Sequence, residues 1–167
     1  MSQTALVELF HGKAAHADPV ACVADLPADL AARTIDGFPH SIWQLLSHMN
    51  YWMHYELQRI QGAAPAYPEH ASGSWLPNAA PPDEAAWNEA IGRLHELIDA
   101  SIRLAQSDVA LLEREVAPAH SQQSQHASSV QAILWQLVAH NSYHTGQIAT
   151  LRHCLGAWPP RGGGDTW

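Results

Sequence analysis

The feature that most constrains the fold of this chain is a helical pattern running from about residue 130 to residue 155. Apolar residues and two histidines recur there at spacings of three and four, in one stripe made of Leu137, His140, His144, Ile148 and Leu151. His140 and His144 are four positions apart, so they lie one turn apart on the same helical face. Because that face is apolar and should be buried, each imidazole needs a polar partner. A divalent metal ion would satisfy both, and since two ligands rarely suffice, we expect a third elsewhere in the chain.

A second helix is predicted where Ser41-Ile-Trp-Gln44 has the form of a capping box. This helix should run to about Gln61, because Gly62 is placed to end it. Its apolar stripe consists of Leu45, His48, Met49, Trp52 and Tyr55. His48 is therefore predicted to point inward among large apolar groups, as His140 does.

These two helices share a short sequence pattern. Trp43-Gln-Leu-Leu-Ser-His48 in one helix matches Trp135-Gln-Leu-Val-Ala-His140 in the other. Four positions after the matching histidines stand Trp52 and His144, respectively. If the helices pack antiparallel, His48 approaches His140, so that one helix supplies one ligand and the other supplies two. A single buried histidine is more often a packing residue than a ligand, but three that converge favour a metal site.

The other helical patterns predict an all-α protein, a four-helix bundle without a substantial sheet. The first helical region should be broken, because Asp18-Pro19 and Pro27 each begin a new turn. The third long helix should span about residues 83–105, with its own apolar stripe at spacings of three and four.

The fourth helix is the one that carries His140 and His144. Ser128 and Gln131 form a second candidate capping box at its start, and Gly156 is placed to end it. Before it, residues 109–116 should form a short helix or an extended segment, and residues 120–126 a polar loop.

The segment between the second and third helices, residues 62–82, is rich in proline, glycine and alanine. A connection of this length can return to the starting end of a helix, which is about 30 Å long for 20 residues. The second and third helices are therefore expected to run parallel. We read residues 1–167 as a single domain, with a non-helical tail at residues 157–167.

Composition limits the classes of function. The chain is 47% hydrophobic and 14% charged, as in globular proteins, and its net charge of −8 argues against nucleic-acid and anionic-membrane partners. No apolar run reaches the length of a membrane span, and the first residues lack the pattern of a signal peptide. We therefore expect a cytoplasmic protein in which Cys22 and Cys154 are reduced, with a disulfide between them as the alternative.

Several other polar residues are weaker site candidates. His95, beside the stripe of the third helix, is either an extra ligand or a boundary residue, and His16 is a candidate for lining the pocket. Gln44, Gln136 and Gln147 each lie about one turn from a ligand histidine and could hydrogen-bond to it, although Gln44 is also the capping residue. The remaining candidates are expected on the surface or in loops: His54, His70, His120 and His126.

The chain resembles the DinB/YfiT-like family of metal-binding helical bundles. The resemblance rests on the segment from Ser41 to Trp52 and on the H-x3-H-x-G-Q motif of residues 140–147. It implies a four-helix bundle with an up-down-down-up course and a long crossover between helices two and three. It also implies a divalent metal such as zinc or nickel bound by His48, His140 and His144. Some members of that family use a low-molecular-weight thiol (bacillithiol, mycothiol or glutathione), and members are often homodimers.

Three histidine ligands leave at least one coordination position for water or substrate, as catalytic zinc sites do. A metal there could lower the pKa of a bound water or thiol. The function that follows is S-transfer from a thiol to a small electrophile, with metal-dependent hydrolysis second. The alternative is a non-catalytic metal-binding bundle of the stress response, which a fourth protein ligand such as His95 would favour. No GxSxG motif is present, and Cys154 lies off the histidine face, so no separate nucleophile is predicted.

Three tryptophans lie on segments that helix packing cannot bury. Trp75 is in the crossover, and Trp158 and Trp167 follow the fourth helix. Leaving such rings in water forgoes roughly 2 kcal/mol or more each. They are expected either to wall the metal pocket, where a small-molecule substrate would bind, or to cover the end of the bundle or a dimer interface.

Overall fold

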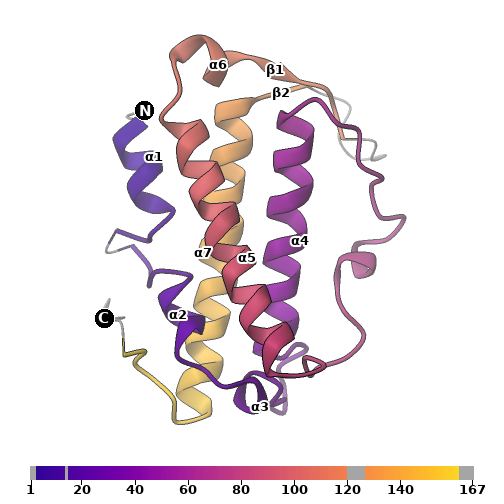
Figure 1. Ribbon diagram of the computed structural model, residues 1–167, viewed down its shortest axis with the longest axis vertical. Coiled ribbons are helices and arrows are strands. Elements are labelled where there is room, and N and C mark those ends of the chain that lie inside the picture. The colour runs from indigo at the N-terminus through magenta and orange to yellow at the C-terminus, as the bar shows by residue number, and fades with distance from the viewer. Residues whose placement is uncertain (1–2, 14, 120–126, 162–167) are drawn as a thin grey trace.

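The computed structural model describes residues 3–13, 15–119 and 127–161, and four of its helices form the bundle. Figure 1 shows α4 and α5 running in one direction, with α1 and α7 running in the other. The predicted four-helix bundle with its up-down-down-up course is therefore confirmed. In chain order the helices are α1 (Gln3–Leu9), α2 (Ala21–Ala24), α3 (Ala28–Ala31), α4 (Ile42–Ile60), the short 3₁₀ turn η1 (Ala71–Ser74), α5 (Glu84–Ala105), α6 (Val109–Glu113) and α7 (Val130–Cys154).

The first helical region is broken, as predicted. The Asp18 carboxylate accepts a hydrogen bond from the Ala21 amide at 2.8 Å, so it caps the first turn of α2. Pro27 precedes α3, and its carbonyl accepts from the amides of Leu30 and Ala31 at 3.1 Å. The short helices α2 and α3 carry the chain down to the start of α4 (Figure 1).

Helix α4 begins and ends where the sequence predicts. The Gln44 amide donates to Ser41 Oγ at 3.2 Å, while the Ser41 amide donates to Gln44 Oε1 at 3.0 Å, so the capping box is complete. Gly62 adopts φ +89° just past the helix, a conformation that glycine reaches at little cost.

The crossover from α4 to α5 passes along the outside of the bundle and contains η1 (Figure 1). Two hydrogen bonds fasten its second half to the start of α4. Ser41 Oγ donates to the Ala79 carbonyl at 2.6 Å, and Gln44 Nε2 donates to the Leu76 carbonyl at 2.8 Å. The crossover therefore returns to the starting end of α4, and α5 runs parallel to α4 (Figure 1).

The start of α7 corrects one prediction. Ser129, rather than Ser128, caps the helix, because its Oγ accepts from the Ala132 amide at 3.1 Å. Ser128 instead pairs with Val116 in a short antiparallel ladder between β1 (Glu115–Val116) and β2 (Ser128–Ser129). The extended backbone needed for this pairing delays the helix by one residue. Residues 109–116, predicted as either a short helix or an extended segment, form the helix α6 and then the strand β1. Residues 120–126, predicted as a polar loop, lie outside the described part of the chain.

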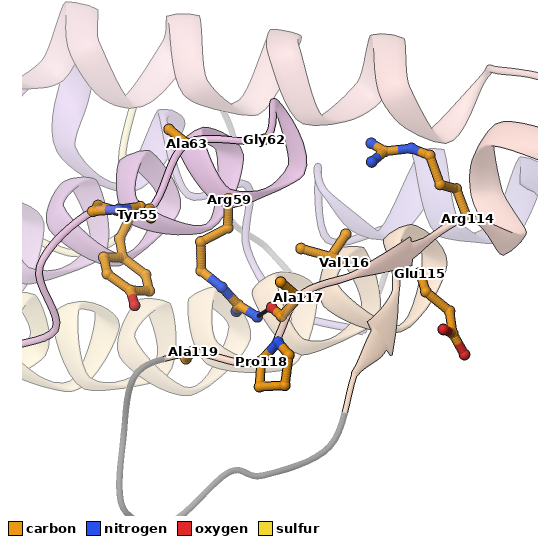
Figure 2. Close-up of a pocket in the computed structure, with 12 residues that line it drawn as sticks. Tyr55, Arg59, Gly62, Ala63, Arg114, Glu115, Val116, Ala117, Pro118 and Ala119 are labelled. Carbon is orange, nitrogen blue, oxygen red and sulfur yellow. Dashed lines mark hydrogen bonds between the residues drawn. The ribbon is translucent and has the colours of Figure 1, made fainter.

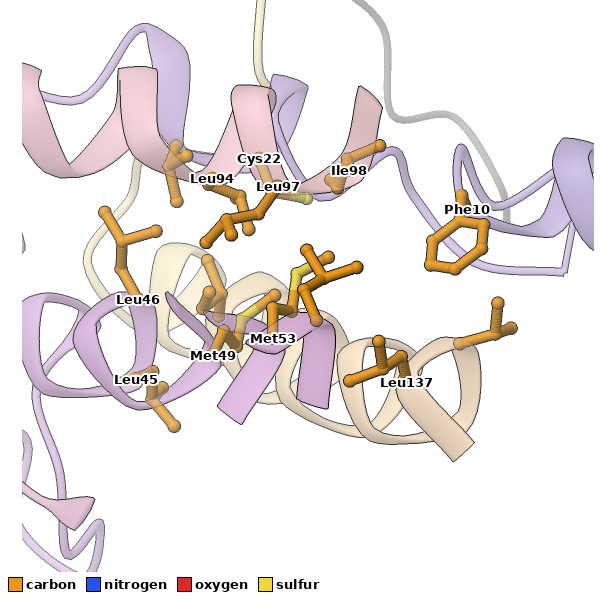
Figure 3. Close-up of a cluster of buried hydrophobic side chains, with 14 of the residues drawn as sticks. Phe10, Cys22, Leu45, Leu46, Met49, Met53, Leu94, Leu97, Ile98 and Leu137 are labelled. Atoms are coloured by element: carbon orange, nitrogen blue, oxygen red, sulfur yellow. The ribbon is translucent and has the colours of Figure 1, made fainter. Parts of the chain in front are cut away.

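One apolar core fills the space between the long helices (Figure 3). Trp87 lies fully buried in it and donates its indole N–H to the Leu26 carbonyl at 2.6 Å. Cys22 is also buried there, and burial raises the pKa of its thiol to about 12, whereas Cys154 is exposed. Both thiols are free, so the alternative of a disulfide between them is wrong. The buried side chains drawn in Figure 3 include Phe10, Leu46, Met49, Met53, Leu94, Ile98 and Leu137.

Helix α7 ends as predicted, with Gly156 at φ +68° and residues 157–161 non-helical. None of the described helices is both long and apolar enough to cross a membrane.

Candidate metal centre

The side chains of His48, His140 and His144 meet between α4 and α7. Nε2 of His140 lies 3.2 Å from Nε2 of His48 and 3.1 Å from Nε2 of His144. One nitrogen from each ring lies within 4.8 Å of the others, and His48 and His144 are only 7% and 4% exposed. The three histidines that the sequence singled out are thus brought together in a cluster that could hold a metal ion.

Gln147 orients His144. Its Oε1 lies 2.7 Å from Nδ1 of His144, and an amide oxygen can only accept, so the proton of that imidazole belongs on Nδ1. Nε2 of His144 then presents a lone pair to the cluster. The predicted hydrogen bond between Gln147 and His144 is confirmed.

Ser74, in the crossover, orients His48 in the same way. Its Oγ lies 3.1 Å and its carbonyl oxygen 3.4 Å from Nδ1 of His48. Since the carbonyl can only accept, these contacts favour a proton on Nδ1 and a lone pair on Nε2 of His48. Nothing in the sequence near Ser74 indicated this contact, because it depends on how the crossover folds back.

The donor set fits a metal ion. Nε2 of both His48 and His144 presents a lone pair to His140. A neutral His140 has one N–H, so it can donate a good hydrogen bond to only one of them, and the other lone pair would lack a donor. A cation between the three Nε2 atoms would meet all three lone pairs at once. The observed separations are close to the roughly 3.3 Å expected between two nitrogens bound at about 2.0–2.1 Å to a tetrahedral zinc ion.

Burial keeps these imidazoles neutral, which is the form that binds metals. It lowers the pKa of His48 to about 4 and that of His140 to about 3, with neighbouring imidazoles of the cluster adding to the effect. Burial also lowers the pKa of His144, although the hydrogen bond to Gln147 opposes that shift. All three rings are therefore uncharged near neutral pH.

The indole of Trp75 covers the cluster from the crossover side. It stacks on His48 with ring centroids 3.7 Å apart, and on its other face it stacks on His40 at 3.6 Å. It also meets the edge of His144 at 5.8 Å. Trp75 therefore lies against the histidine cluster, as predicted, although it is not among the residues that line the cavity beside His140. His40, which directly precedes the cap of α4, was not predicted, and no pattern in the sequence points to it.

The two tryptophans that follow α7 are Trp158 and Trp167. Trp158 stacks on His153 at 5.0 Å, beyond the end of α7, so its predicted place at the pocket is wrong and the bundle-end alternative holds. The short turn after Gly156 cannot carry it back to the middle of the helix. Trp167 lies outside the described residues, and the homodimer stays a prediction.

A cavity of about 470 Å³ is lined mainly by residues of α4 and α7, His140 among them. Trp52 and Tyr67 stand in its wall, with ring centroids 5.5 Å apart. Glu56 and Arg59 also line it, with Arg59 Nη1 donating to Glu56 Oε2 at 2.5 Å. Sequence reasoning missed this pair, although a glutamate and an arginine three positions apart on an inward-facing stripe were the available signal.

Arg59 also lines a second, smaller hollow of about 160 Å³ (Figure 2). In that view its guanidinium points toward Ala117, whose carbonyl accepts from Nη2 at 2.7 Å. Tyr55 and Pro118 are among the other residues lining this hollow. Arg59 therefore ties α4 to the segment after β1 while reaching the larger cavity.

Six weaker candidates can also be placed. His95 is exposed, 3.8 Å from Asp99, and does not join the cluster, so the idea of an extra ligand there is wrong, and the side chain faces solvent rather than the boundary of the core. His16 is buried against the Ala17 carbonyl at 2.8 Å and does not join the cluster. Gln44 is occupied by the capping box and the crossover, and Gln136 lines the cavity wall. His54 and His70 are exposed, as predicted, whereas His120 and His126 lie outside the described residues.

Comparison with known proteins agrees with the resemblance seen in the sequence. The family described as "DinB family" matches residues 1–162. No curated protein and no solved structure matches the chain. Because the matched region covers nearly all of its 167 residues, the chain belongs to the DinB family.

Proposed function

We propose that this protein is a metal-dependent enzyme that joins a low-molecular-weight thiol, through its sulfur, to a small electrophile. The observation that carries the proposal is the convergence of three Nε2 atoms beside a cavity that His140 lines and that is large enough for a small molecule. In such a transfer the thiol loses its proton, its sulfur forms a bond to the electrophilic carbon, and the leaving group departs with its electron pair.

A zinc or nickel ion, when bound, would supply a Lewis-acidic centre that lowers the pKa of a thiol or water. The chain's own residues would do the rest. His48, His140 and His144 hold the ion, and Gln147 and Ser74 fix the rings of His144 and His48. Trp75 shields the His48 ring from water, and the cavity beside His140 admits the substrate.

The number of ligands favours catalysis over a purely structural metal. Structural zinc sites are usually closed by four protein ligands, whereas catalytic sites keep a position open. In the part of the chain that the structure describes, the cluster has three members, and the exposed His95 is not one of them. This supports a substrate position beside His140.

The test combines metal content with turnover. Purified protein is analysed for bound metal and then screened with bacillithiol, mycothiol and glutathione against several electrophiles. His48→Ala and His144→Ala should lose stoichiometric metal and all turnover, while the exposed His95→Ala should keep both. Full metal content in both ligand variants would reject the triad. Failure with every thiol would reject S-transfer, and hydrolysis of ester or amide substrates would then be tested on the same metal-loaded protein.

A further inference from the structure

The cavity beside His140 is lined in part by two charged residues that the proposed reaction does not use. Glu56 and Arg59 stand in its wall, with their side chains only 8% and 10% exposed. Their contact at 2.5 Å is a buried ion pair. Burying such a pair is costly, and apolar residues of similar volume often stabilise a fold as well or better. The pair therefore calls for a reason beyond stability.

The register of α4 places this pair at a defined distance from the histidines. His48, Trp52 and Glu56 follow one another at intervals of four, so they lie along one face of the helix. Eight residues of α-helix rise on the order of 12 Å. His140, which contacts His48, lines the cavity together with Trp52, Tyr67 and Glu56, and along α4 Trp52 lies between His48 and Glu56. The cavity thus suits an elongated ligand with two different ends.

Both charged groups keep capacity for a ligand. A guanidinium has five N–H donors, and the contacts of Arg59 with described residues use one on Glu56 and one on Ala117. Burial raises the pKa of Glu56 even though Arg59 opposes the shift. The carboxylate is thus incompletely compensated by Arg59, and a further positive group beside it would be favourable.

We propose that Glu56 and Arg59 form a subsite for a zwitterionic α-amino-acid group, with the ligand's ammonium against Glu56 and its carboxylate against Arg59. The inference rests on the proposed function, since the other end of the same ligand would carry the sulfur to the histidines. A ligand end of only one sign would be attracted by one member of the pair and repelled by the other. A zwitterion matches both, and the rings of Trp52 and Tyr67 would pack along the ligand's apolar body.

The probe for this subsite is S-methylglutathione, whose γ-glutamyl end is a zwitterion and whose blocked sulfur cannot undergo transfer. Its binding to the metal-loaded protein is measured by calorimetry beside two analogues, one lacking the γ-glutamyl ammonium and one lacking the adjacent carboxylate. Removing either charge should weaken binding at least about tenfold, because each takes part in a charge-assisted hydrogen bond. In Glu56→Gln/Arg59→Gln all three compounds should bind with the same weak affinity.

The chain offers a matched control. Arg93 and Glu96 form another ion pair three positions apart, at 3.3 Å on the exposed face of α5, so Arg93→Gln/Glu96→Gln should bind the three compounds as the wild type does. Because Arg59 also holds Ala117, the single variant Glu56→Gln is measured too, since it leaves that contact in place. It should abolish the discrimination between the parent compound and the analogue without the ammonium.

Results against the subsite are distinct from results against the proposed function. Equal binding of all three compounds to the wild type, no binding of S-methylglutathione, or unchanged discrimination in Glu56→Gln/Arg59→Gln would overturn the subsite, while thiol turnover would be unaffected. Charge discrimination that depends on the pair, in a protein that turns over no thiol, would retain the subsite and reject S-transfer.

Discussion

Trp75 stacks face to face on His48, with ring centroids 3.7 Å apart and ring planes 6° apart. The two residues are separated by more than half of the crossover and by the last three turns of α4, so only the return of the chain brings them together. The stack restricts rotation of a candidate ligand ring from one side, while Ser74 fixes its Nδ1. Two residues of the crossover therefore help to orient the His48 ring within the histidine cluster.

The stack should matter for metal affinity. Trp75→Ala removes the surface that holds His48 in place, and we expect the affinity for zinc to fall on the order of tenfold, as for other groups that orient a ligand. Competition with a chelator of known affinity measures the change. Trp75→Phe should recover part of the loss, and Trp158→Ala, at the far end of α7, should have no effect. Equal affinity in Trp75→Ala and wild type would show that the stack is only packing.

Gln147 should act through the tautomer of His144. Gln147→Leu removes the acceptor for Nδ1–H, so a larger share of the ring will carry its proton on Nε2, where the metal should bind. We expect zinc affinity to fall about 10–100-fold. Gln147→Glu keeps an acceptor oxygen and should retain most of the affinity. The control is Gln58→Leu, a half-buried glutamine on α4 away from the cluster, and a loss as large in this variant would contradict the explanation.

The metal-free protein should lose stability as the pH falls from about 6.5. The pKa of His48 is lowered to about 4 and that of His140 to about 3 in the folded state, both from 6.5. Between the folded and unfolded pKa values, the unfolded chain binds more protons than the folded protein. The free energy of unfolding is therefore highest above pH 6.5, and below it falls by up to about 1.4 kcal/mol per pH unit for each histidine. Urea unfolding at pH 5.0 and 7.0 measures this change. His48→Ala/His140→Ala should show a flatter profile, and identical slopes in both proteins would contradict the assignment.

Arg152 should be the most important buried charge for stability. It is 2% exposed and donates to Asp25 Oδ1 at 2.8 Å, to the Cys22 carbonyl at 2.6 Å and to the Ala157 carbonyl. Burial alone would raise the pKa of Asp25, but hydrogen bonds from Arg152 and Arg161 lower it overall. Arg152→Ala removes the donors to both carbonyls and leaves Asp25 with the Arg161 amide in place of a buried charge partner, and we expect a loss of about 3–5 kcal/mol in the free energy of unfolding at pH 7. The exposed Arg103→Ala serves as the control in the same denaturant titration, and a loss below about 1 kcal/mol in Arg152→Ala would reject this role.

Local patterns in the sequence were enough to predict the long helices and the three histidines. The spacing of His140 and His144 places them on one face of any helix they form, and the capping box of Ser41 and Gln44 requires only neighbouring residues. His48 could be added because the same pattern of apolar residues surrounds it. These features depend on interactions within about four residues, which helix geometry alone determines.

Contacts between distant segments could not be predicted in this way. The sequence pointed to Ser128 as the cap of α7, but the ladder with β1 holds both Ser128 and Ser129 in extended backbone, so the helix begins after Ser129, which becomes the cap. Trp75 and Trp158 both needed a place to dock, and only the folded crossover put the first on His48 and left the second beyond α7. Glu56 and Arg59 became part of a cavity because α7 packs along the same face of α4. Such contacts join residues that are far apart in the sequence, so their free energy depends on which surfaces meet across the bundle. For this reason only the tertiary structure decided how the histidines are oriented, what covers them and which cavity lies beside them.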